Sequence, residues 1–389
     1  MADDIVATLQ LKYNGAETLA GDPGTTAVNL RAAQGVVSVS VDMRMDSPDM
    51  FSIEFDMKDL EKDRLLDTFE LGAEITVSMQ MAEACATPLC IGEISYIEPC
   101  FDAEAGHRTT ISGYHKLHRL TRGQRSKTWG DGLEASQVPT TAVKDVINNS
   151  KAHEGAKTDG MAAGQLAPTD VKLKYIPQLN MSDFEFLRAI GANLEFKADP
   201  DGAKDVKFTK ADPASAPVKV LAKEALRTGG AKATGDFILT ATFRMSTVQQ
   251  YAAVEVRGWD PETKKNIVSK VTSSTYAFDG SKGHEETGKG LYKSGATGRK
   301  YIVVDQPIGS AQEAKALAQA LFDQFSMDFL TGEAVVTGDP KLRPGETVQF
   351  DGFGKAYSGK YLITSATHTF RPEEGYRTAI AFARNVKAA

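Results

Sequence analysis

Apolar and polar residues alternate along two consecutive runs near the start of the chain. In residues 37–46, valine and methionine occupy one face, while serine, aspartate and arginine occupy the other. The alternation resumes in residues 51–58, after Ser47-Pro48-Asp49-Met50. A period of two residues, interrupted by a Pro-Asp turn, predicts a long antiparallel hairpin with one buried face.

The rest of the chain is predicted to be rich in strands, with few helices. Serine followed three residues later by glutamate is a capping box, and two such boxes predict helices that begin at Asp183 and just after Ser310. Residues 143–147 predict a short third helix, and residues 151–167 and 199–217 are predicted to be loops. Further strands are predicted at residues 74–79, 92–97, 108–114, 237–245, 252–259, 266–273, 347–350, 361–369 and 378–384.

One long segment has no apolar periodicity. Residues 277–300 hold six glycines and four lysines, and they are predicted to form a mobile loop. His284-Glu285 and Gly288-Lys289-Gly290 lie in this segment, but neither matches the spacing of a zinc protease or of a phosphate-binding loop.

Two segments far apart in the chain resemble each other. Phe101–Ile111 and Phe370–Ile380 share six of eleven residues without a gap, at an offset of 269 positions. Residues 71–75 and 343–347 extend the likeness upstream, with a slightly changed spacing. The likeness could indicate a duplication, and the alternative interpretation is that both segments carry a common β-hairpin signature. Duplicated β-modules would let a cyclic trimer present six similar modules and join a sixfold partner to a threefold one.

Composition narrows the classes of function. The 389 residues suggest two or three domains. The net charge is −6 and the pI about 5.7, which argues against a dedicated nucleic-acid binder. No apolar run reaches the length of a membrane span, and the acidic start does not resemble a signal peptide. Three cysteines without a C-x-x-C predict no disulfide scaffold and a reducing compartment.

Candidate metal ligands are poorly placed. His107, His115 and His118 form the only histidine cluster of the sequence. On a single strand, His115 and His118 would point to opposite faces, because side chains alternate. Cys90 and Cys100 match no zinc spacing and are expected to act as small apolar residues. We therefore predict no metal site and no cofactor.

The basic run before Trp129 and the corner at Trp259 each have a structural and a functional interpretation. A basic run precedes Trp129 and either contacts phosphate or forms a solvated linker face; the second interpretation is favoured because no aromatic residues are interleaved. The corner Trp259-Asp260-Pro261 is predicted to be a packed turn. The sequence contains no nucleophile elbow of the G-x-S-x-G type. The basic run consists of Arg119, Arg122, Arg125 and Lys127.

Several short motifs occur in an order that resembles a known family. They are His118-Arg-Leu-Thr-Arg-Gly-Gln-Arg-Ser-Lys-Thr-Trp129, Tyr175-Ile-Pro-Gln-Leu-Asn-Met-Ser-Asp-Phe-Glu-Phe-Leu187, Val256-Arg-Gly-Trp-Asp260, Gly338-Asp-Pro-Lys-Leu-Arg-Pro-Gly345, Phe353-Gly-Lys-Ala-Tyr-Ser-Gly-Lys-Tyr361, His368 and Gly375-Tyr-Arg-Thr378. In this order the chain resembles the phage late control gene D family, the baseplate hub of contractile tails, which is related to the N-terminal part of VgrG proteins of type VI secretion. The resemblance covers roughly residues 35–385.

The resemblance, together with the patterns above, predicts an α+β, β-rich fold with two duplicated tube-like antiparallel β-barrel modules and intervening mixed α/β domains. The first module is expected at residues 1–118 and a mixed α/β domain at 119–205. A β-rich domain with the mobile loop 277–300 is expected at 206–300, and a helix with the second tube-like module at 301–389. The family implies no catalytic, cofactor-binding or metal-binding residue and no enzyme activity.

The same resemblance implies the partners. The protein would be a homotrimer that joins the hexameric inner tube to the trimeric central spike, and other baseplate proteins would contact it. Because the sequence stops at Ala389 just after the last module, the spike is expected to be a separate trimeric protein. Specific nucleic-acid binding and stable membrane insertion are not expected. Assembly would occur in the bacterial cytoplasm, and the protein would become part of a virion tail or a released injection particle.

Two further hypotheses belong to other classes of function. A baseplate-associated cell-wall hydrolase would need paired carboxylates or a Cys/His dyad in a cleft. Glu98, Asp102 and Glu104 are the candidate acidic cluster, although a solvated turn is the favoured interpretation. A carbohydrate-binding β-protein would need exposed aromatic residues. The chain has only two tryptophans and 8% aromatic residues, which gives this hypothesis little support.

Overall fold

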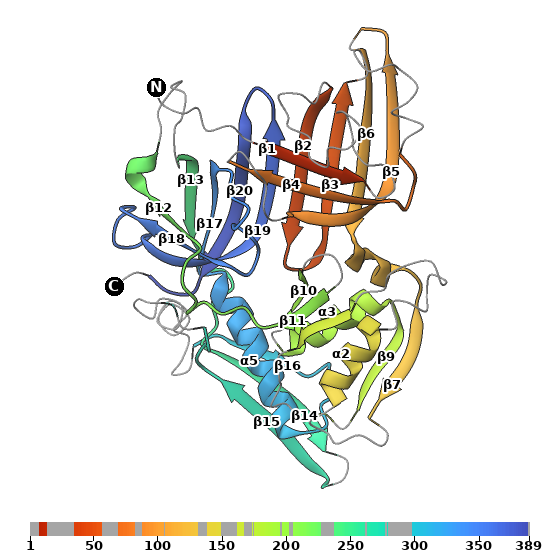
Figure 1. Ribbon diagram of the computed structural model, residues 1–389. Coiled ribbons are helices and arrows are strands. Elements are labelled where there is room, and N and C mark those ends of the chain that lie inside the picture. The colour runs from red at the N-terminus through yellow and green to blue at the C-terminus, as the bar shows by residue number, and fades with distance from the viewer. Residues whose placement is uncertain are drawn as a thin grey trace.

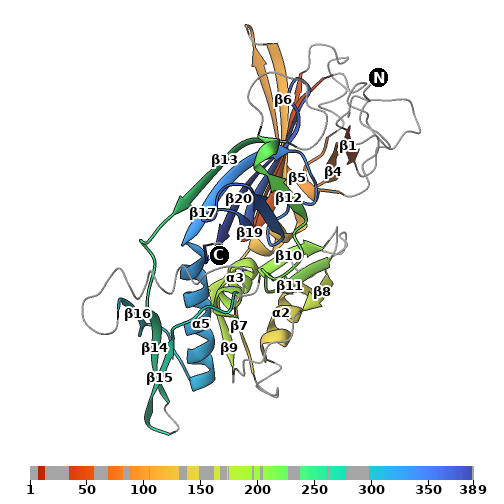
Figure 2. The same ribbon diagram turned by 90° about the vertical axis from the view of Figure 1, so that its left-hand side faces the viewer.

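The computed structural model contains a large, mainly antiparallel sheet and two smaller parts that hold the long helices (Figure 1). Seen from the side, helix α5 extends from below the large sheet along a small sheet of three strands (Figure 2). The structure describes residues 8–13, 35–56, 69–81, 88–104, 106–130, 138–148, 162–166, 173, 175–194, 197–201, 205–226, 237–260, 263–276, 278 and 298–387.

The first half of the large sheet comes from the N-terminal third of the chain. Its strands follow the order β1-β4-β5-β6-β3-β2, and all neighbours are antiparallel. The expected hairpin of β2 and β3 is present, with one face buried. Its turn is Met45-Asp46, so the prediction that Ser47-Pro48-Asp49-Met50 forms the turn is wrong; these residues begin β3 because Ser47 already pairs with Arg44. The bounds are β1 Thr8–Tyr13, β2 Val36–Arg44, β3 Ser47–Asp56, β4 Glu74–Gln80, β5 Cys90–Asp102 and β6 Gly106–His115.

The second half of the large sheet repeats this order with strands from the C-terminal half of the chain. The sequence of neighbours β4-β5-β6-β3-β2 corresponds to β18-β19-β20-β17-β13. The outermost strands differ, because β12 runs parallel to β18 whereas β1 is antiparallel to β4. The bounds are β12 Lys219–Ala222, β13 Ile238–Met245, β17 Leu330–Thr337, β18 Thr347–Asp351, β19 Gly359–Arg371 and β20 Gly375–Arg384.

The strand registers of the two halves also correspond. The β5–β6 pair breaks its register just after Ile94, and the β19–β20 pair does so after Ile363, which is 269 positions later. The β2–β3 and β13–β17 pairs break theirs just after Val36 and Ile238. Because a bulge bends a strand and strengthens its twist, matching bulges give the two halves the same local curvature.

At one equivalent position, a phenylalanine faces a glycine on the neighbouring strand in both halves, but the two residues have exchanged strands. In the first half Phe51 of β3 lies across from Gly113 of β6, and in the second half Gly332 of β17 lies across from Phe382 of β20. Both rings are buried. A Cβ atom on either glycine would come within 2.6 Å of the facing ring, so each pair has room for a single side chain.

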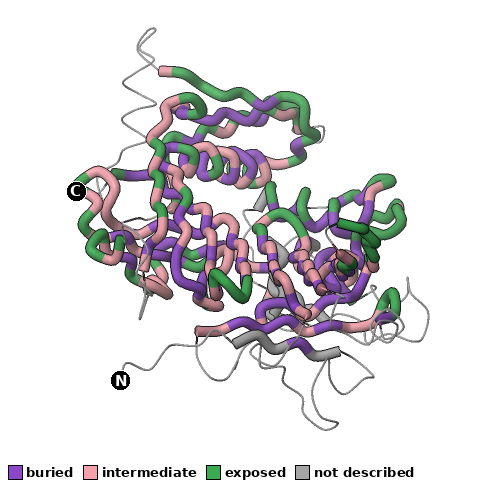
Figure 3. Tube along the Cα trace, turned by 90° about the horizontal axis from the view of Figure 1, so that it is seen from above, coloured by how far each residue is buried: buried purple, intermediate pink, exposed green. Residues whose placement is uncertain are grey.

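The two halves join through β2 and β19, which pair antiparallel from Val39–Phe370 to Arg44–Ser365. Thr367 Oγ1 donates a hydrogen bond of 2.9 Å to Asp42 Oδ1 across this junction. Seen from above, the sheet strands alternate between buried and less buried positions (Figure 3). Because β2 and β19 are paired, the two halves form one continuous sheet.

The middle of the chain forms a small α/β part with its own apolar core. Two segments expected to be loops, within 151–167 and 199–217, contain strands instead; β11 lies in the second and buries Phe208 in this core, which stabilises it. The elements are the 3₁₀ helix η1 Lys116–Thr121, β7 Arg125–Trp129, α2 Val138–Asn148, β8 Ala162–Leu166, β9 Ile176–Met181, α3 Asp183–Leu194, β10 Lys197–Asp201 and β11 Asp205–Thr209.

The third part is inserted between β13 and β17 and consists of α5 packed on a three-stranded sheet. Both predicted capping boxes are present. Ser310 Oγ accepts from Glu313 N at 3.1 Å at the start of α5, and Ser182 Oγ accepts from Glu185 N at 3.2 Å before α3. The elements are β14 Ala253–Asp260, β15 Lys265–Val271, β16 Lys300–Val303 and α5 Ala311–Met327; the short 3₁₀ helix η3 Lys223–Ala225 follows β12.

The secondary structure does not follow all the expected domain boundaries. The boundary between 119–205 and 206–300 falls inside β11, and β13 of the expected 206–300 domain pairs with β17 of the expected 301–389 domain. The loop expected at 277–300 lies outside the described residues, apart from Phe278 and residues 298–300. None of the helices that the structure describes is both long and apolar enough to span a membrane.

Candidate interaction surfaces

The predicted histidine cluster does not converge on a common point. His115 ends β6, and its Nδ1 accepts a hydrogen bond of 3.1 Å from the backbone N–H of Leu117. His118 lies in η1, so the expectation that both rings belong to one strand is wrong; the chain leaves the sheet directly after His115. In the described part of the chain, no group of three His, Cys, Asp or Glu side chains could hold a metal ion.

The two described cysteines differ in environment. Cys90 is buried in the core of the first half, and burial raises the pKa of its thiol. Cys100 is an exposed free thiol near the far end of β5. Cys85 lies outside the described residues.

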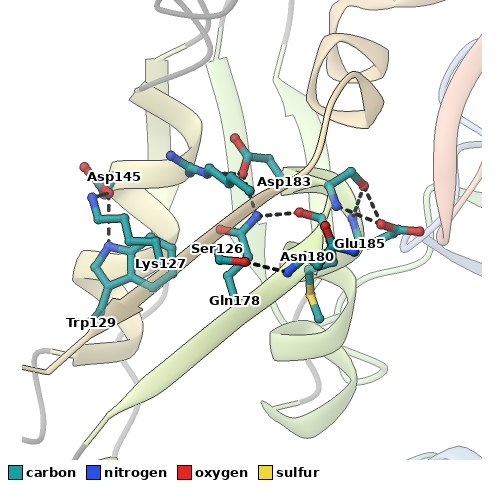
Figure 4. Close-up of polar contacts among 11 residues, drawn as sticks. Ser126, Lys127, Trp129, Asp145, Gln178, Asn180, Asp183 and Glu185 are labelled. Atoms are coloured by element: carbon teal, nitrogen blue, oxygen red, sulfur yellow. Dashed lines mark hydrogen bonds and ion pairs between the residues drawn. The ribbon is translucent and has the colours of Figure 1, made fainter.

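Three members of the basic run, Arg119, Arg125 and Lys127, are engaged by acidic partners within the chain, and Arg122 contacts His118 Nε2. Lys127 Nζ lies 2.5 Å from Asp145 Oδ2, which also accepts a hydrogen bond of 3.0 Å from Trp129 Nε1 (Figure 4). Partial burial raises the pKa of Asp145, but the Lys127 and Trp129 bonds outweigh it and leave that pKa below its usual value. Arg125 Nε donates to Asp183 Oδ1 at 2.5 Å. These contacts support the structural interpretation of the run.

Arg119 of the same run is almost fully buried. Its guanidinium group makes two hydrogen bonds to the carboxylate of Glu93, one of them 3.0 Å long from Nε to Oε2. Glu93 belongs to β5 and Arg119 to η1, so the ion pair fixes the exit from the first half of the sheet.

The remaining candidates lie on turns or exposed strands. Asp102 Oδ1 accepts a hydrogen bond of 2.8 Å from the backbone N–H of Glu104, which places these two members of the expected acidic cluster at the β5–β6 turn. Glu98, the third member, lies within β5 opposite Thr110. Trp259 lies in β14 and is 54% exposed, so the prediction of a packed turn at this tryptophan is wrong. The β14–β15 strands turn this face to solvent because α5 covers the opposite one.

A cleft of about 1200 Å³ lies where the large sheet approaches α3 and α5. Arg188 and Arg244 line it from α3 and β13, while Asp328 and Glu333 contribute carboxylates. No sequence motif indicated this cleft, because its residues come from elements that are distant along the chain.

The most extensive open features are two edges of the large sheet. Beyond Ile94, which still exchanges backbone hydrogen bonds with Gly72 and Ala73, β5 continues to Asp102 with β6 as its one described neighbour. Likewise, β13 pairs with β17 on one side, and among described residues the other side meets only Leu226 at Ile238. Exposed strand edges present unpaired N–H and C=O groups and favour pairing with another strand.

Comparisons with solved structures agree on the fold. A tail protein from Neisseria meningitidis MC58 superposes with a TM-score of 0.64 at 12% identity, covering 98% of this chain and 97% of that one. The 43 kDa tail protein of prophage MuSo2 from Shewanella oneidensis gives 0.65 at 14%, covering 97% and 98%. An E. coli type VI secretion component, described as structurally similar to the T4 bacteriophage tail proteins gp27 and gp5, gives 0.53 at 11%, covering 98% and 77%.

The fold is therefore that of phage tail proteins. The sequence model described as the Alg8 N-terminal domain matches residues 159–372, more than half of the chain, and the protein belongs to this family. No match was found among curated proteins.

These comparisons confirm the expected β-rich α+β fold and the expected relation to phage tail proteins at the level of the fold. The narrower assignment to late control gene D and VgrG remains a prediction, as do the homotrimer and the separate spike. The two sheet edges were not singled out from the sequence. The likeness of Phe101–Ile111 to Phe370–Ile380 was the available sign. It aligns the end of β19, which pairs with a strand on each side, with the end of β5, which pairs with β6 alone among described residues.

Proposed function

We propose that this protein is the structural baseplate hub of a contractile phage tail or a related contractile injection particle. In this role three copies form a ring of six tube-like modules that joins the hexameric inner tube to a trimeric central spike. The role is mechanical: the hub templates the tube, and the spike travels with it when the sheath contracts.

The observation that carries this proposal is the repeated half of the large sheet. The order β4-β5-β6-β3-β2 recurs as β18-β19-β20-β17-β13, with corresponding register breaks. A chain with two equivalent modules gives a threefold ring a near-sixfold face, which suits a sixfold tube. The tail-protein fold supports the same role.

The test is co-purification of the chain with the tube and spike proteins encoded beside its gene, followed by imaging of the particle. The proposal expects binding to both proteins and three copies of the chain in one layer of the particle. Failure to bind either folded partner, or six copies in that layer, would remove the hub assignment.

A cell-wall hydrolase is the second candidate, and the cleft is the observation that favours it. Asp328 and Glu333 lie in its lining, where paired carboxylates could act as acid and base. We expect no lysis band on a peptidoglycan zymogram, because the role proposed here needs no chemistry. A band that Asp328→Asn or Glu333→Gln abolishes would instead establish the enzyme.

A further inference from the structure

The internal junction between the two halves indicates how copies of the chain meet. We infer that β13 of one copy pairs antiparallel with the outer edge of β5 in a second copy, and so repeats the β2–β19 junction between molecules. This inference rests on the proposed ring, and it specifies which strands and residues close it.

The two edges correspond to the two strands of the internal junction. In the repeated order β5 is the equivalent of β19, and β13 is the equivalent of β2. Within one chain β19 of the second half pairs with β2 of the first half. The equivalent pair, β5 with β13, lies at the two far sides of the sheet and is separated by six strands, so one chain cannot form it (Figure 1).

Equivalent residues of the two halves differ in burial, as expected if the edges of β5 and β13 lack a neighbouring strand. Phe370 of β19 is 4% exposed, whereas its equivalent on β5, Phe101, is 69% exposed. Val41 of β2 is fully buried, whereas its equivalent Phe243 on β13 is only partly buried. A second copy seated on these edges would cover both aromatic residues, as β2 and β19 cover their equivalents.

The register of the internal junction predicts which residues meet. Thr367 lies opposite Asp42 there, and the equivalent positions are Glu98 on β5 and Arg244 on β13. Within the described residues neither Glu98 nor Arg244 has an ion-pair partner, so the predicted contact joins two free and opposite charges. The neighbouring predicted pairs are Pro99 with Phe243, Cys100 with Thr242, and Phe101 with Ala241.

Pro99 is compatible with this pairing. Proline has no N–H and is confined mainly to edge strands, which agrees with the position of β5 in the isolated chain. It removes at most one donor from the intermolecular ladder. Strand addition of this kind derives affinity from backbone hydrogen bonds and specificity from alternate side chains. Here Glu98 and Phe101 provide that specificity.

The predicted interface joins two different surfaces, so it is heterologous. Such contacts generate a ring when the rotation closes and a filament when it does not. In the proposed hub, internal and intermolecular junctions alternate around the ring.

The native Cys100 provides a direct test. In a Cys85→Ser background, Thr242→Cys places a thiol opposite Cys100 of the next copy, and mild oxidation should then yield disulfide-linked dimers and trimers. The reaction is run on the concentrated chain alone and on the chain co-expressed with the tube protein. Mass spectrometry should find the peptide that joins position 242 to Cys100.

Two matched controls define the result. Adding Cys100→Ser to the Thr242→Cys variant should abolish the crosslink, and Val268→Cys, on the exposed face of β15, should give none. Absence of the 242–100 link in both preparations, with both thiols reactive toward maleimide, would overturn the strand pairing. If the chain still bound tube and spike in that case, the hub function would stand and only this interface would fall.

Discussion

His368 is fully buried in the second half of the sheet, in a site that suits only its neutral form. Its Nε2 lies 3.1 Å from the carbonyl oxygen of Leu342, which can only accept, so Nε2 carries the proton. Its Nδ1 then accepts from the hydroxyl of Tyr376 at 2.7 Å. Burial, together with the nearby Arg343 charge, lowers the pKa of His368 to about 3.

This site should make the protein sensitive to mild acid. Below about pH 6.5 the unfolded chain binds a proton at His368 that the folded chain does not. The free energy of unfolding should therefore fall by about 1.4 kcal/mol per pH unit from that pH toward pH 3. Above about pH 6.5 the stabilisation that comes from keeping His368 neutral is fully present. His368→Gln should flatten that slope in urea unfolding between pH 7 and 4.5. An unchanged slope in this variant would contradict the account.

Gly113 is required because the ring of Phe51 occupies the space beside it. A Cβ atom there would lie 2.6 Å from the ring and 2.0 Å from the carbonyl oxygen of Glu93. Gly113→Ala should therefore lower the free energy of unfolding by about 2–3 kcal/mol. The control is Gly309→Ala, where the nearest atom is 3.7 Å away and the change should stay within about 0.5 kcal/mol. Equal effects in thermal unfolding would contradict this account.

Single residues were predicted well where local chemistry decides their role. The capping serines Ser182 and Ser310 act through residues three positions away, so the sequence contains the whole interaction. The exposure of Phe101 could not be predicted in that way. Its equivalent Phe370 has a similar sequence context, and only the presence of β2 beside β19 separates a buried ring from an exposed one.

At the scale of elements, a buried ion pair holds η1 against β5. Removing only Arg119 by Arg119→Met should leave the Glu93 charge buried and uncompensated, and it should cost about 3–5 kcal/mol of stability. The double variant Glu93→Leu, Arg119→Met should recover most of that loss, because no charge is left in the apolar site. A double-mutant cycle in urea gives the coupling energy. Additive effects of the two changes would show that the pair does not act as a unit.

Strands with clean alternation were predicted, whereas irregular ones were missed. The prediction did not include β17, because Gly332 interrupts its apolar pattern to admit the ring of Phe382. The Asp-Pro step at Pro200 suggested a loop, yet it lies in β10, an edge strand that tolerates a missing N–H. In both cases a neighbour distant in the sequence determines the structure.

For the whole molecule, reversing one charge at either edge should weaken association between copies. Glu98→Lys brings a cation opposite Arg244, and Arg244→Glu brings an anion opposite Glu98, so each variant should associate roughly tenfold more weakly, or about 1.4 kcal/mol. The double variant restores opposite charges and should recover association. Sedimentation velocity at low salt measures the effect, and Lys270→Glu, on exposed β15, is the control. If the double variant associates no better than either single one, the predicted register is incorrect.

The β2–β19 junction also changes how assembly depends on the amount of protein. A ring of six separate modules would lose the translational and rotational freedom of five bodies, at roughly 4–15 kcal/mol each, whereas three chains lose that of only two. The internal junctions close when each chain folds, at any concentration. Ring formation should then scale with the third power of chain concentration rather than the sixth, which would let assembly begin while the protein is still scarce.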